Sequence, residues 1–126
     1  MTYATTNPYT GEVVKTFPDA TDAEIIQAIE DANTAFLSWK NSSFAERAKV
    51  LHKAADLLRN DIDGYAKLLT LEMGKITVEA KAEVELSAAI FEYYAVNAEK
   101  LLAPEKLPVA DLAEGDAVLV NDPYLP

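Results

Sequence analysis

Four runs of apolar residues that recur at spacings of four and three constrain the fold of this chain more than any other feature of its sequence. Residues at this spacing share one face of an α-helix. Two of the predicted helices begin at a capping box, Thr21 with Glu24 and Ser43 with Glu46. The short connections between the runs favour antiparallel packing of neighbours. The runs predict helices over about 22–39, 44–60, 61–73 and 77–102.

The fourth predicted helix is the longest and is apolar over a wide arc. Its main stripe consists of Ala80, Val84, Ala88, Phe91, Ala95, Ala98 and Leu102. Further apolar residues lie elsewhere on the cylinder, namely Leu86, Ile90, Tyr93 and Tyr94. A helix of this kind is normally covered on more than one side. Pro104 ends it, because proline cannot continue a helix.

Extended segments are expected only at the two ends of the chain. Residues 3–17 predict a β-hairpin, with Asn7-Pro8 and Gly11 in its turn. Residues 104–116 predict a loop, and 117–120 predict a strand. This strand, with Val118, Leu119 and Val120, is expected to be an interface strand that pairs with another chain, pairs with the N-terminal hairpin, or stays unpaired. The predicted fold class is mainly α, with about four helices, an N-terminal hairpin and a C-terminal strand.

The composition restricts the classes of protein that the chain can represent. It has 126 residues, the size of one domain, and half of them are hydrophobic. A net charge of −10 argues against nucleic acid and anionic membrane partners, which usually meet basic surfaces. No apolar run approaches the roughly 20 residues of a membrane helix, and the first residues lack a signal-peptide pattern. These features fit a cytoplasmic protein.

Motifs within the chain favour structural roles over chemistry. Cysteine is absent, so thiolate metal sites and a cysteine nucleophile are excluded within these residues. The stretch LEMGK has one glycine and no following Ser or Thr, so it predicts a helix C-terminus rather than a phosphate loop. His52 lacks a metal-binding cluster around it in the sequence. The fourth helix carries carboxylates that predict a solvated face, namely Glu79, Glu83, Glu85, Glu92 and Glu99. We therefore predict no catalytic, cofactor-binding or metal-ligating residue.

Taken in order, four segments resemble the N-terminal part of aldehyde dehydrogenases. They are NPYTGEVVKTF, FLSWKNSSFAERAKVLHKAADLL, LEMGK and EAKAEVELSAAIFEYYAVNAEKLL. The subgroup that the chain resembles most is the bacterial NAD(P)-dependent succinate-semialdehyde dehydrogenases. The resemblance implies structural roles in helix packing and at a helix terminus for Trp39, Arg47, Leu51, Glu72, Gly74 and Lys75. It also implies that Leu86 borders the substrate tunnel of a complete enzyme.

The resemblance implies that the chain is a fragment of a larger α/β fold. Residues 1–20 would be a leading hairpin, 21–103 a helical layer of the cofactor domain, and 104–126 a loop with the start of an oligomerisation strand. Such enzymes attack the aldehyde with a thiolate, pass hydride to NAD or NADP, and release the acid with water. The catalytic Cys, Glu and Asn and the cofactor motifs are expected outside this chain. We therefore expect it to be inactive alone.

Two further interpretations remain open. In the first, the chain is a helical association module, because its wide apolar arc and terminal strand need partners. Such a module would form a homo-oligomer or bind the remaining part of a split dehydrogenase. Alternatively it is a small acidic binding domain unrelated to aldehydes, which would need a ligand cleft formed by these helices alone.

Overall fold

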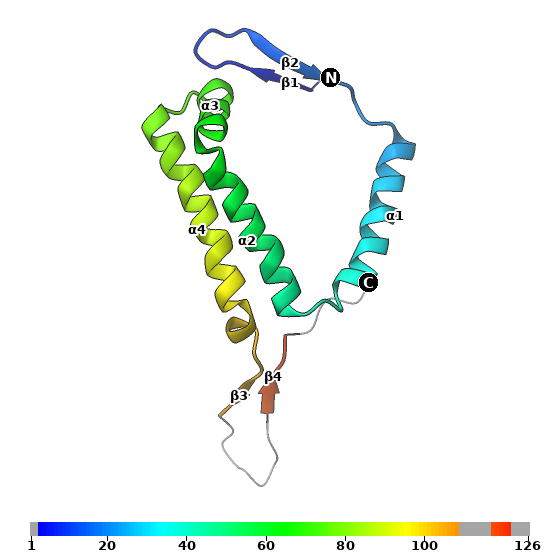
Figure 1. The fold of residues 1–126 in the computed structure, drawn as a ribbon. Helices are drawn as coiled ribbons and strands as arrows, with labels where there is room; N and C mark the ends of the chain where they lie inside the picture. Colours follow the sequence, from blue (N-terminus) through cyan, green and yellow to red (C-terminus); the bar gives the residue numbers. More distant parts are fainter. Residues whose placement is uncertain (1–2, 109–116, 122–126) are drawn as a thin grey trace.

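The computed structural model describes residues 3–108 and 117–121, which form four helices flanked by two short β-hairpins (Figure 1). The predicted mainly α fold is confirmed, and each helix begins and ends within one residue of its predicted bounds. In chain order the elements are β1 (Tyr3–Thr6), β2 (Val13–Phe17), α1 (Asp22–Trp39), α2 (Phe44–Asn60), α3 (Ile62–Met73), α4 (Thr77–Leu101), β3 (Glu105–Leu107) and β4 (Ala117–Leu119).

Local hydrogen bonds explain where the first helices begin. At α1, the Thr21 hydroxyl accepts from the Glu24 N–H at 3.3 Å, and the Glu24 carboxylate accepts from the Thr21 N–H at 2.8 Å. At α2, Ser43 and Glu46 repeat this arrangement at 3.2 and 2.8 Å. These donors hold the pKa of both glutamates below its ordinary value. Both predicted capping boxes are therefore confirmed.

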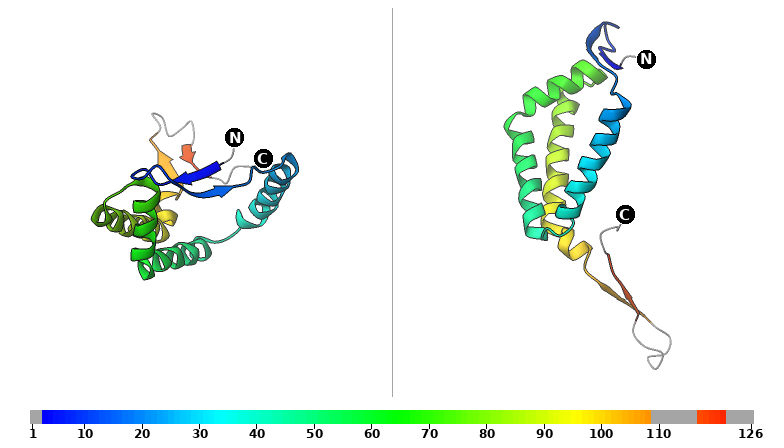
Figure 2. Two further views of the ribbon diagram at one scale, coloured as in Figure 1. Left: turned by 90° about the horizontal axis from the view of Figure 1, so that it is seen from above. Right: turned by 90° about the vertical axis from the view of Figure 1, so that its right-hand side faces the viewer.

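A single residue joins α2 to α3. Asp61 follows the last residue of α2 and precedes the first residue of α3, with φ −133° and ψ 46°. Its Oδ1 accepts from the Gly64 N–H at 3.1 Å and so caps α3. The two helices consequently turn sharply against each other with no loop between them (Figure 2).

The N-terminal hairpin rests against the corner where α3 passes into α4. Gly74 ends α3 in the left-handed conformation, with φ +69°, and its N–H donates to the Thr70 carbonyl at 3.0 Å. A methyl group on Gly74 would lie 3.0 Å from Cγ of Pro8, in the turn between β1 and β2. Gly74 therefore meets two requirements at once: a positive φ and close contact with the hairpin.

Packing is concentrated on α4, which lies against both α2 and α3. In contrast, α1 stands apart from this layer (Figures 1 and 2), and in the described part of the chain no other element packs extensively on it. None of its residues is buried. The helices thus form an open layer rather than a closed bundle.

The core of this layer is thin. Of the described residues, five are buried, and four of these are alanines: Ala55, Ala66, Ala80, Val84 and Ala88. The main stripe predicted for α4 supplies the last three of them. Its second apolar side is uncovered, since Leu86, Ile90, Tyr93 and Tyr94 are all exposed. The expectation that α4 is covered on more than one side is therefore not met by the described residues.

The C-terminal strand has a partner that the sequence did not reveal. Of the predicted loop at 104–116, the part from Glu105 to Leu107 is strand β3, which pairs antiparallel with β4. The strand therefore neither stays unpaired nor pairs with the N-terminal hairpin, and its partner within this chain is one that the sequence did not suggest. The pairing went unnoticed because β3 is three residues long, between Pro104 and Pro108, too short for alternation to register. Val120 lies just beyond β4, and residues 109–116 and 122–126 lie outside the described residues.

The two roles of Gly74 can be separated by comparison with Gly11. Gly11 also has a positive φ, +73°, but a methyl group there would meet nothing within 4 Å. We expect Gly11→Ala to lower the free energy of unfolding by about 1 kcal/mol, from backbone strain alone. Gly74→Ala adds the contact with Pro8 and should cost about 2 kcal/mol. Urea unfolding measures both, and equal losses would contradict the contact.

Candidate functional site

Charged and apolar side chains come together at several places within residues 3–108 and 117–121. In that part of the chain, no group of three or more His, Cys, Asp or Glu side chains lies close enough to hold a metal ion. No helix there is long and apolar enough to cross a membrane. The described residues also form ion-pair clamps, an apolar pocket and uncovered apolar surfaces.

A charged clamp joins α2 to α4. The Arg59 guanidinium donates to both oxygens of Glu92, at 2.6 and 2.9 Å, and through Nε to Glu85 at 2.8 Å. Such bidentate, charge-assisted pairs are among the strongest hydrogen bonds in proteins. They raise the pKa of Arg59 and lower the pKa of Glu92. The sequence placed both glutamates on a solvated face. Their spacing of seven, which puts them on one side of α4, is the signal that was missed.

The LEMGK stretch is a helix terminus, as predicted, and its lysine has a specific partner. Lys75 forms an ion pair with Glu83 on α4. Nearby, Lys81 on α4 pairs with Asp63 on α3. Glu72, also in this stretch, is exposed. These pairs tie the corner between α3 and α4 together beside Gly74.

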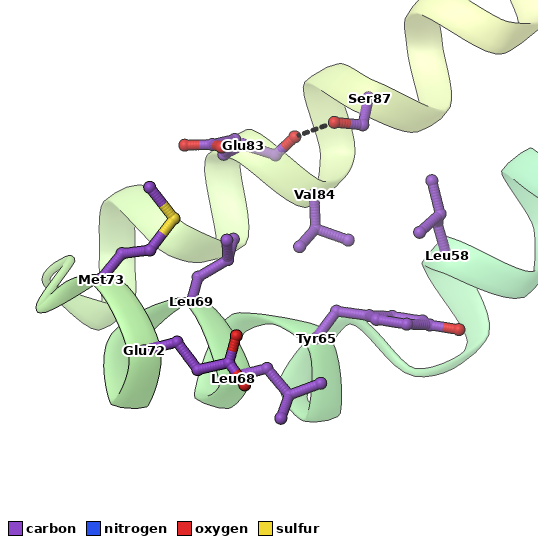
Figure 3. Close-up of a pocket in the computed structure, with 9 residues that line it drawn as sticks. All are labelled: Leu58, Tyr65, Leu68, Leu69, Glu72, Met73, Glu83, Val84 and Ser87. Atoms are coloured by element: carbon purple, nitrogen blue, oxygen red, sulfur yellow. Dashed lines mark hydrogen bonds between the residues drawn. The ribbon is translucent and has the colours of Figure 1, made fainter. Parts of the chain in front are cut away.

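An open pocket of about 300 Å³ lies where α2, α3 and α4 meet (Figure 3). Leu58, Leu69 and Val84 are among its apolar walls, and the carboxylates of Glu72 and Glu83 lie at its margin. The volume is at the low end for small-molecule sites. Its full lining is Leu58, Tyr65, Leu68, Leu69, Glu72, Met73, Glu83, Val84 and Ser87.

Arg47 organises the turn between α1 and α2. Its guanidinium donates to the carbonyls of Lys40 at 3.2 Å and Ser42 at 2.9 Å, and to the Ser42 hydroxyl at 3.0 Å. It also lies 5.4 Å from the centre of the Phe44 ring. Trp39, the last residue of α1, accepts from the Ser42 hydroxyl through its carbonyl. Arg47 therefore makes three hydrogen bonds to this turn from a half-buried position.

Leu51 is half-buried on α2, and the other remaining predicted residues lie on exposed surface. Leu86 is 60% exposed and borders a shallow hollow beside Lys75 and Glu83. Its place beside a substrate tunnel stays a prediction. Val118 and Leu119 lie in β4, opposite Lys106 and Glu105, and both are about half exposed, as is Val120. Nothing in the described residues covers these side chains, so they are available to a partner.

Comparison with known proteins identifies the family. The model of the family described as "Aldehyde dehydrogenase family" matches residues 1–124, nearly the whole chain. The chain belongs to the aldehyde dehydrogenase family. It corresponds to the N-terminal segment of that family, which confirms the resemblance found in its sequence.

Curated relatives narrow the similarity to one subgroup. A succinate-semialdehyde dehydrogenase [NADP(+)] from Deinococcus radiodurans is 44% identical over 121 residues, which are 96% of this chain and 25% of the relative. The succinate-semialdehyde dehydrogenase [NADP(+)] 1 of Mycobacterium tuberculosis is 47% identical over 126 residues, 100% of this chain and 27% of the relative. The chain thus spans about a quarter of the length of the curated relatives it matches.

Solved structures have the same arrangement of elements. The structure of Gox0499 matches 98% of this chain, with a TM-score of 0.89 and 36% identity, over 27% of its own length. The succinic semialdehyde dehydrogenase from Streptococcus pyogenes, solved with NADP+ as the cofactor, matches 92% of this chain, with a TM-score of 0.82 and 38% identity, over 25% of its own length. The fold of this chain is therefore a segment of the aldehyde dehydrogenase fold.

The Arg59–Glu92 clamp gives the stability of the fold a specific pH dependence. Because the pKa of Glu92 is lowered in the folded state, its contribution is present above the ordinary glutamate pKa and is lost as the pH falls through the folded value. We expect Glu92→Gln to lower the urea midpoint at neutral pH and to differ less from the parent in acid. Glu99→Gln, also on α4, is the control. Equal effects of both variants at neutral pH would contradict the clamp.

Proposed function

We propose that this chain supplies the N-terminal part of an NADP-dependent succinate-semialdehyde dehydrogenase. The observation that carries the proposal is the 47% identity to the Mycobacterium tuberculosis enzyme over all 126 residues. The Deinococcus radiodurans relative bears the same name. Identity at this level along the entire segment favours the same kind of complete enzyme over a distant use of the fold.

Within such an enzyme, the role of this segment would be to cover and support the remainder of the fold. The five buried residues of the described part of the chain are small and form a thin core. The apolar residues of α1 and the second side of α4 are left for another part of the protein to cover. The solved relatives have about three quarters of their length beyond the matched segment, which provides an occupant for these surfaces. The division at 1–20, 21–103 and 104–126 follows from this proposal.

The chemistry would come from outside these residues. The family reaction needs a thiolate that attacks the aldehyde carbon, and this chain contains no cysteine. NADP would be bound by the remainder of the fold as well. The contribution of this chain would be indirect. Leu86, on α4, would border the substrate path, and the α3–α4 corner would hold α4 in position.

A chimera tests the proposal. Residues 1–126 replace the matching segment of the Deinococcus radiodurans relative, and NADPH formation is followed with succinate semialdehyde. We expect kcat/KM within about tenfold of the parent, which corresponds to about 1.4 kcal/mol of transition-state stabilisation. The same relative without its matching segment is the control and should be inactive. A folded chimera that oxidises other aldehydes but not succinate semialdehyde would overturn the substrate while keeping the family role.

The isolated chain should not catalyse the reaction, because it lacks the nucleophile. Purified residues 1–126 mixed with succinate semialdehyde and NADP+ should form no NADPH above the rate without protein. NADPH formation that rises in proportion to the concentration of the chain would contradict this expectation.

A second candidate is a non-catalytic association module. The wide exposed arc of α4 and the half-exposed strand β4 favour it, since large apolar surfaces and strand edges usually have partners. We expect the chain alone to form a homo-oligomer, and when the rest of a dehydrogenase is present to bind that instead. Size-exclusion chromatography with light scattering measures the mass. A monomer that persists at high concentration would contradict self-association.

A further inference from the structure

The position of α1 depends on its two connections rather than on packing. No residue of α1 is buried, and within residues 3–108 and 117–121 no other element packs extensively on it. One connection is the extended segment 18–21 after β2, and the other is the turn 40–43 before α2 (Figure 1). The turn is the tighter of the two, because hydrogen bonds tie it to both helices.

On the α1 side, the turn continues the hydrogen bonding of the helix. The Lys40 N–H donates to the Phe36 carbonyl at 2.9 Å, and the Asn41 side chain donates to the Leu37 carbonyl at 3.0 Å. The Ser42 N–H and hydroxyl both donate to the Trp39 carbonyl, at 3.0 and 2.6 Å. The turn is therefore rigidly attached to the last turn of α1.

On the α2 side, the attachment is Arg47. It bonds the Lys40 carbonyl, the Ser42 carbonyl and the Ser42 hydroxyl from the first turns of α2. The last turn of α1 contains no basic residue. Arg47 thus brings a positive charge from the next helix to the carbonyls of the turn that follows α1, close to the helix C-terminus, where a cation is favourable. A guanidinium suits this position because its donors are fixed in one plane.

We propose that Arg47 is a positioning residue that holds α1 away from the α2–α4 layer. Hydrophobic attraction has no preferred direction. The exposed apolar side chains of α1, such as Ile25, Ile26 and Ile29, would otherwise draw it onto the exposed apolar side chains of α2 and α4. The bonds of Arg47 are directional and oppose this collapse. They keep the apolar side chains of α1 free for the remainder of the enzyme.

The comparison with Gox0499 shows a similar position of α1 in a longer protein. Only 2% of this chain lies outside that match, and the 18 residues of α1 are more than that, so α1 belongs to the superposed part. The TM-score of 0.89 means that α1 occupies a similar position in the longer protein. The identity of the part that covers α1 in a complete enzyme rests on the proposed function. The position of α1 relative to α2 and α4 does not.

A distance measurement on the isolated chain tests the proposal without the rest of the enzyme or any activity. The labelled chain is diluted with an excess of unlabelled chain, so that self-association adds no distances between copies. Since the chain has no cysteine, spin labels can be placed at chosen sites only. Glu30→Cys with Lys53→Cys reports the distance between α1 and α2, and Lys53→Cys with Ala89→Cys reports the distance between α2 and α4; all three positions are exposed. We expect narrow distance distributions for both pairs in the parent. Arg47→Ala should broaden the first distribution at least twofold, or shorten its mean, and leave the second unchanged.

Two further variants separate positioning from general loss of structure. Arg47→Lys keeps the charge but cannot reach both carbonyls and the hydroxyl together, so it should broaden the α1–α2 distribution too. Lys49→Ala removes a charge two residues away, with no bond to the turn, and should leave both distributions unchanged. If Arg47→Ala also changes the α2–α4 distance, it has disturbed the whole layer, and the α1–α2 distribution of Arg47→Lys then tests the proposal. A broad α1–α2 distribution in the parent, or an unchanged one in Arg47→Lys, overturns the proposal. Neither result bears on whether the chimera is active.

Discussion

The close approach of α4 to α2 and α3 holds the described structure together, and small side chains make it possible. The buried residues of these helices are Ala55 on α2, Ala66 on α3, and Ala80, Val84 and Ala88 on α4. Alanine lets helix backbones approach, but each one buries little apolar surface, at about 0.8 kcal/mol per buried methylene-sized group. The contact is therefore flanked by charged pairs at the edges of the same interface.

These pairs are distributed along the length of α4. Arg59 reaches from α2 to two glutamates, while Lys81 and Lys75 secure the corner with α3. They fix the direction in which the helices lie more than they add stability, since partly exposed ion pairs contribute little. A thin contact of mostly alanine residues, flanked by ion pairs, suits a layer of helices that packs against a larger part of the same protein. The family membership and the quarter-length match of the relatives agree with that interpretation.

Local features of the structure could be predicted from the sequence, and long-range ones could not. The helix bounds and both capping boxes depend on residues three to four apart, so their patterns are visible in the sequence. The Arg59 clamp joins residues 26 and 33 positions apart. The spacing of seven puts both glutamates on one side of α4, but no sequence pattern links them to Arg59. Likewise, the structural role of Arg47 is implied only by the family resemblance, whereas the LEMGK stretch itself places Lys75 at a helix C-terminus. Their partners, two backbone carbonyls and Glu83, became known only from the coordinates.

The junction at Asp61 limits how this family segment can vary in length. Since α2 and α3 share a single linking residue, a residue inserted or deleted there has no loop to absorb it. One residue corresponds to about 100° of rotation about a helix axis. Such a change would swing Ala66 away from α4 and bring a larger side chain into this contact. The length of the α2–α3 unit is therefore fixed by geometry, so insertions have to be accommodated in other connections.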